Sequence, residues 1–152
     1  MNFTNKILVL FFCSTITAQI TFAQSNDYEQ LMNEITQISN DYSGILNSRQ
    51  TWEVSYEGCE VTDQYFFDDE LILILKINLA NIETVKVEER FSNSIALYPK
   101  ENNADYIEAI RYENGQAEKI TDGVYYNLMV MPDMREKVQE MMQQAILSCQ
   151  NE

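Results

Sequence analysis

The chain has 152 residues, and its 24 Asp and Glu outnumber its 10 Lys and Arg, so its formal net charge at pH 7 is −14. This charge argues against binding to nucleic acid or to an anionic membrane surface through electrostatic attraction. The absence of histidine excludes Ser-His-Asp and Cys-His catalysis, and no P-loop, G-x-G-x-x-G or G-x-S-x-G motif occurs. We therefore predict no enzymatic activity, no catalytic residue, no cofactor and no metal site.

The first 23 residues have the three parts of a secretory signal peptide. Lys6 supplies a positive charge, an apolar run follows at 7–12, and Thr21-Phe22-Ala23 has small residues at its first and third positions. A membrane anchor is the alternative, but a spanning helix needs about 20 apolar residues. We predict cleavage between Ala23 and Gln24, a single globular domain at 24–152, and export to the periplasm or out of the cell.

Two cysteines remain in the mature chain, Cys59 and Cys149, because Cys13 lies in the predicted signal peptide. An even pair in an oxidising compartment favours a disulfide. The alternative is two separately buried thiols that pack as small apolar side chains. A Cys59–Cys149 bond would fix the last helix to the strand region around Cys59.

Amphipathic helices are predicted at both ends of the mature chain. From Asp27 onward, apolar residues recur with a period of 3.6, at Tyr28, Leu31, Met32, Ile35 and Tyr42. Beyond Pro132, one face of a second helix carries Met134, Val138, Met141, Met142, Ala145, Ile146 and Cys149. Each helix therefore has an apolar face that must dock on a sheet.

Strands are predicted between these helices. Trp52, Val54 and Tyr56 alternate with polar residues, and a second strand runs from 59 to 67. The acidic segment 68–70 is predicted to be a solvated turn, with a calcium site as the alternative. The continuous apolar run 71–75 indicates a strand covered on both faces. Further strands are predicted at 85–91 and 95–98.

Two turn signals follow eight residues apart. Asn114-Gly115 and Asp122-Gly123 each lie between strand-like runs, and such pairs favour two-residue type I′ turns because both central residues need a positive φ. The sequence therefore predicts three consecutive antiparallel strands over 106–131.

The predicted fold is α+β, with an antiparallel meander or partly open barrel of seven to eight strands flanked by the two helices. Over 51–149 this element order is similar to a pleckstrin-homology-like barrel with a C-terminal helix, although the basic loop of its phosphoinositide binders is absent. The run 51-TWEVSYEGCEV-61, joined to a helical cysteine, also resembles small exported bacterial proteins of uncharacterised function. Neither resemblance implies a catalytic residue.

The last predicted strand has two mainly apolar faces, with Tyr126 on one and Tyr125 and Met129 on the other. Such a strand is either covered on both sides or lines a cavity for a small apolar ligand. Two functional hypotheses follow. The first is an exported, non-enzymatic protein that acts through contact with a macromolecule, with an unknown protein as partner. The alternative is a binder of a small apolar ligand within the curved sheet, with Tyr125, Tyr126 and Met129 lining its site.

Overall fold

The computed structural model describes residues 27–46, 48–88, 92–100, 106–120 and 126–151. The N-terminal helix spans 27–45, and the C-terminal helix α2 spans Arg135–Gln150. Between them lie the strands β1 (Gln50–Glu57), β2 (Glu60–Phe67), β3 (Glu70–Asn78), β4 (Ile82–Lys86), β5 (Ser94–Pro99), β6 (Ile107–Glu113), β7 (Gln116–Ile120) and β8 (Tyr126–Met129). The α+β class with one helix at each end is confirmed.

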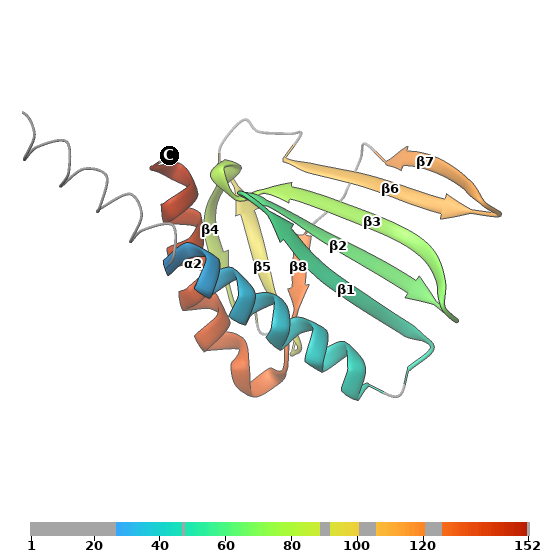
Figure 1. The fold of residues 1–152 in the computed structure, drawn as a ribbon, viewed down its shortest axis with the longest axis horizontal. Coiled ribbons are helices and arrows are strands. Elements are labelled where there is room, and N and C mark those ends of the chain that lie inside the picture. Colours follow the sequence, from blue (N-terminus) through green and yellow to red (C-terminus); the bar gives the residue numbers. More distant parts are fainter. Residues whose placement is uncertain (1–26, 47, 89–91, 101–105, 121–125, 152) are drawn as a thin grey trace, which may run out of the picture.

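The strands form two open antiparallel sheets, which corrects the expectation of a single meander or a partly open barrel. The larger sheet has the order β1-β2-β3-β6-β7 and the smaller one has the order β4-β5-β8 (Figure 1). The chain first passes from the larger to the smaller sheet at the 3-10 turn Leu79–Asn81, where the Asn78 side chain accepts a hydrogen bond from the Ala80 N–H. Leu79 is completely buried there. This anchored turn ends β3 and directs the chain into the smaller sheet.

The predicted hairpin at Asn114-Gly115 is confirmed, whereas the predicted pairing of the following strand with it is wrong. Asn114 and Gly115 have φ values of 50° and 75° and join β6 to β7, as the Asn-Gly pair predicts. Asp122-Gly123 lies outside the described residues. The strand beyond it, β8, pairs with β5 of the smaller sheet. Its buried residues Tyr126 and Leu128 explain this pairing, because β5 is equally apolar whereas β7 is polar and exposed.

The N-terminal helix lies along β1, at the edge of the larger sheet (Figure 1). Asn40 bonds both backbone groups of Val54, because its Nδ2 donates to the carbonyl at 2.9 Å and its Oδ1 accepts from the N–H at 2.7 Å. The Trp52 N–H donates to Ser43 Oγ at 2.8 Å. The helix thus satisfies backbone groups that an edge strand would otherwise leave open to another strand.

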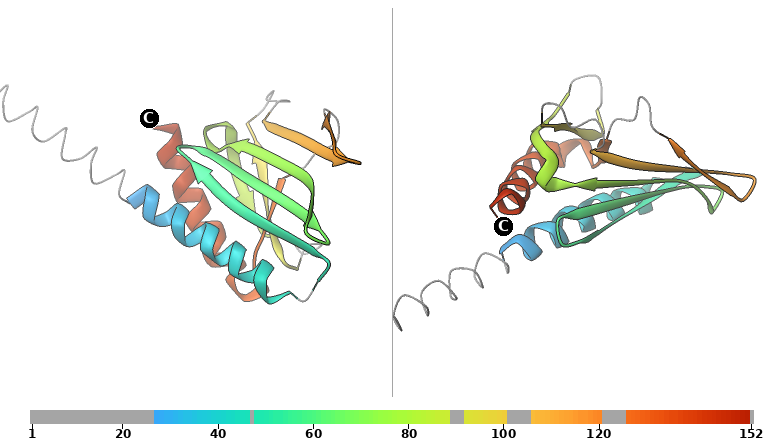
Figure 2. Two further views of the ribbon diagram at one scale, coloured as in Figure 1. Left: turned by 45° about the vertical axis from the view of Figure 1, so that its right-hand side comes forward. Right: turned by 90° about the horizontal axis from the view of Figure 1, so that it is seen from above.

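α2 packs its apolar stripe against the smaller sheet, at the side of the molecule where the N-terminal helix also lies (Figure 2). Met142, Ala145 and Ile146 are completely buried, as the helical period predicts. A contact between Lys137 Nζ and Glu34 Oε1 joins the two helices. Strands β6 and β7 lie on the opposite side of the molecule, away from both helices (Figure 1).

Candidate functional site

The larger sheet has two chemically different faces. Val54, Asp63, Leu75 and Ala109 lie opposite one another across β1, β2, β3 and β6, and all four are buried. This is the inner face, which turns toward the core. Because successive residues of a strand alternate between faces, their immediate neighbours in sequence form the outer face.

The outer face carries an apolar cluster that we call the outer patch. It consists of Phe66, Ile72, Ile74, Ile110 and Tyr112, of which Ile74 and Ile110 lie directly opposite each other. All five side chains are partly exposed, and none packs against the hydrophobic core. The cluster therefore lies outside the buried core.

A change of register between β2 and β3 adds to this patch. Tyr65 pairs with Leu73 whereas Phe66 pairs with Leu71, so Ile72 is an additional residue on β3. Such a bulge bends and twists a strand locally. The expectation that 71–75 is covered on both faces is wrong, because only Leu75 of this run is buried. A continuous apolar run shows that both faces are apolar, but not that both have something packed on them.

The charges around the outer patch are mainly negative. The register places Glu53, Glu57, Glu60 and Glu108 on the outer face with two lysines, Lys76 and Lys119. Lys76 Nζ lies 3.3 Å from Glu60 Oε1, and Lys119 Nζ lies 3.7 Å from Glu108 Oε1. Both lysines are thus paired with acids of this face, and the excess charge at the rim of the patch is negative.

Matched substitutions on β3 test whether the outer patch has a structural role. Ile74 lies on the outer face, whereas Ile77 lies on the inner face and is 1% exposed. We expect Ile74→Thr to change the free energy of unfolding by less than about 1 kcal/mol, because it removes no core contact. We expect Ile77→Thr to cost about 2–4 kcal/mol, because it leaves a cavity and buries a hydroxyl. Urea denaturation measures both free energies of unfolding, and equal losses of stability in the two variants would show that Ile74 packs as part of the core.

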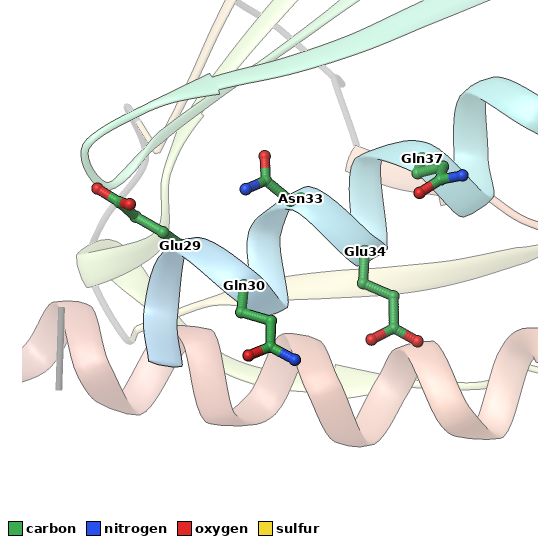
Figure 3. Close-up of a pocket in the computed structure, with 5 residues that line it drawn as sticks. All are labelled: Glu29, Gln30, Asn33, Glu34 and Gln37. Atoms are coloured by element: carbon green, nitrogen blue, oxygen red, sulfur yellow. The ribbon is translucent and has the colours of Figure 1, made fainter. Parts of the chain in front are cut away.

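A second surface feature is a hollow of about 630 Å³ along the N-terminal helix (Figure 3). Its lining residues, Glu29, Gln30, Asn33, Glu34 and Gln37, are all polar and all come from this one helix. Figure 3 shows Gln30 and Glu34 on the side toward α2, whereas Asn33 extends toward the strands. Their polar ends do not converge on one point, and we interpret the hollow as the solvated face of the helix.

The two predicted disulfide residues are joined. Cys59, in the turn between β1 and β2, is bonded to Cys149 in the last turn of α2, with their Cα atoms 5.8 Å apart. Cys149 is the last buried residue of the helix stripe. The bond fixes the end of α2 to the larger sheet, as predicted.

The other predicted site residues have different surroundings. Tyr126 is 1% exposed within the core, and Met129 is partly buried against it. Tyr125, Ala23 and Gln24 lie outside the described residues. Asp68 and Asp69 form the predicted acidic turn, and Asp68 pairs with Arg49. In the described part of the chain, no three Cys, Asp or Glu side chains are grouped to hold a metal ion.

Asp63 is an unusual residue that the sequence interpretation missed. It is completely buried on the inner face of β2, and burial raises the pKa of its carboxyl to about 7, although the Tyr65 hydroxyl offsets part of this shift. The sequence signal was the alternation of Val61, Asp63 and Tyr65, which places the acid on the same face as two apolar or aromatic residues.

Comparison of the chain with protein-family models, with curated proteins and with solved structures found no match. The resemblance to a pleckstrin-homology-like barrel stays a prediction about element order, and the strands described above form two open sheets. The function is therefore inferred from the surface itself.

Proposed function

We propose that this is an exported, non-enzymatic protein that binds another protein on the outer face of its larger sheet. The observation that carries this proposal is the outer patch, in which five apolar side chains lie together on one face without packing on the core. Contiguous exposed apolar surface is unusual on a monomer and is typical of interaction sites. Phe66 and Tyr112 provide the aromatic contacts that interfaces favour.

The partner that best fits this surface presents an apolar centre surrounded by Lys and Arg. The acids of the outer face exceed its lysines, and the whole chain carries a net charge of −14. Opposite charge on the partner would speed encounter and fix the orientation of docking. A second copy of this chain fits poorly, because each copy would bring the same acidic rim and the same negative charge.

The proposed location is outside the cytoplasm, in the periplasm or in the medium. The Cys59–Cys149 bond supports this location, because disulfides form and persist in oxidising compartments. None of the helices in the described ranges is long and apolar enough to cross a membrane.

Photo-cross-linking from single positions tests the proposal. Benzoylphenylalanine replaces Ile74 in one variant and Gln144, an exposed residue of α2, in the matched control. We expect irradiation of cells of the native host to produce one dominant adduct from position 74, with a partner whose isoelectric point is above 7. No adduct at position 74, or the same adduct from position 144, would contradict the proposal.

The ligand-binding alternative stays a prediction, and native mass spectrometry on protein purified from its own host distinguishes it. A bound apolar molecule that survives the charge substitution Ile74→Asp would favour a site within the curved sheet over the outer patch. A bare mass, together with the position-specific adduct, would favour protein binding.

A further inference from the structure

Asp63 lies on the inner face of the larger sheet, which turns toward the core. On β2 it is opposite Val54 of β1 and Leu75 of β3, both of which are buried and apolar. Neither carboxyl oxygen has a hydrogen-bond partner of good geometry among the described residues. A buried acid is normally paired, because removing an unpaired carboxylate from water is costly.

A second buried polar group without a partner among the described residues lies on the smaller sheet. The Tyr126 hydroxyl on β8 is buried and also has no partner among the described residues. Burial raises the pKa of Tyr126 well above its usual value, and the negative charge of Asp63 raises it further. The same two causes, burial first and then Asp63, raise the pKa of Tyr65. The charge on Asp63 thus acts on tyrosines of both sheets.

Among the described residues, no charged group is found that would compensate the carboxylate. Tyr65 on its own strand and Tyr126 on β8 are the titratable groups that influence or are influenced by Asp63. Its cross-strand neighbours on β1 and β3 are apolar. The buried residues of the N-terminal helix and of α2 include serine, threonine and apolar side chains, but no charged one.

We propose that Asp63 is a pH-operated switch of the packing between the two sheets. As a neutral acid it carries no charge and can stay buried in the core near the Tyr126 side chain, and the packing between the two sheets is then closed. As a carboxylate it can only accept hydrogen bonds, and it places an uncompensated charge between the sheets. The open form, in which water reaches this carboxylate, is therefore favoured as the pH rises.

The direction of the pH dependence follows from the linkage between proton binding to Asp63 and opening. The pKa of Asp63 is about 7 in the folded protein against an ordinary 3.8. The closed form binds the proton more tightly, so its stability is fully present below pH 4 and is lost as the pH rises toward 7. Because each pKa unit corresponds to a tenfold change, the opening equilibrium is expected to increase by up to about 10³-fold between pH 4 and pH 8.

Amide hydrogen exchange on the intact, disulfide-bonded protein measures this opening. After correction for the intrinsic pH dependence of exchange, we expect the protection of β8 and of the central β2 amides to fall by up to about 10³-fold as the pH rises from 4 to 8. Asp63→Asn keeps the shape of the neutral acid and should make the protection independent of pH. Asp68→Asn, at an exposed acid paired with Arg49, is the matched control and should keep the wild-type fall.

A titration of the wild-type protein keeps the test independent of how the variants fold. The carboxyl carbon resonance of Asp63 should titrate with a midpoint near 7. A midpoint near the ordinary value, pH-independent protection in the wild type, or an equal fall in Asp63→Asn would each overturn the switch.

Discussion

Replacement of both Cys59 and Cys149 by alanine is expected to lower the free energy of unfolding by about 4 kcal/mol, because the bond between them closes a long loop in the unfolded chain. The two residues are 90 positions apart, and long loops gain the most from closure in the chain-entropy model. The bond also fixes the last turn of α2 to the turn before β2. Guanidinium denaturation of the variant and of the oxidised wild type measures the difference.

Reduction provides the control for this prediction. Dithiothreitol should destabilise the wild type by a similar amount and leave the double variant unchanged. A double variant that unfolds within about 1 kcal/mol of the oxidised wild type would contradict the expected role of the bond.

The second large loss of stability is expected when the helix side chains that hydrogen-bond the backbone of β1 are removed. In the variant Asn40→Ala with Ser43→Ala, the N–H groups of Trp52 and Val54 and the Val54 carbonyl lose their partners. Each unpaired group costs about 1–3 kcal/mol when buried. The bond of the Trp52 N–H is buried and the two bonds of Val54 are partly buried, so we expect a loss of about 3 kcal/mol in all. Urea denaturation measures it.

The same variant should also associate through the opened edge of β1. Unpaired edge groups are a template for strand pairing with another molecule, and physiological salt screens the repulsion between acidic chains. Sedimentation velocity should show oligomers for this variant and a single species for Gln37→Ala, which changes an exposed position of the same helix. Equal behaviour of the two variants would show that the helix does not protect this edge.

Local patterns in the sequence predicted the elements well. The 3.6-residue period located both helices and the buried stripe that ends at Cys149. The alternation at Trp52, Val54 and Tyr56 identified β1, and Asn114-Gly115 identified the β6–β7 turn because both residues need a positive φ. These signals succeeded because the physical causes lie within a few residues of chain.

The arrangement of the strands could not be predicted in the same way. Periodicity shows which faces are apolar but not which strand lies beside which, so the pairing of β8 with β5 was missed. The same limit explains why 71–75 was expected to be covered on both faces. The burial of Asp63 depends on what packs on the inner face of the larger sheet, which no local pattern specifies, although its place in the alternation with Val61 and Tyr65 was visible.

Hydroxyl-radical footprinting tests most directly whether the outer patch is a binding surface. The purified protein is oxidised in buffer and in a cell-envelope or culture extract of its own host, with total protein and radical dose matched. We expect oxidation of Phe66 and Tyr112 to fall in the extract, and that of Leu147, which is 51% exposed on α2, to stay the same. Unchanged oxidation of Phe66 and Tyr112, or protection confined to Leu147, would contradict the proposed function.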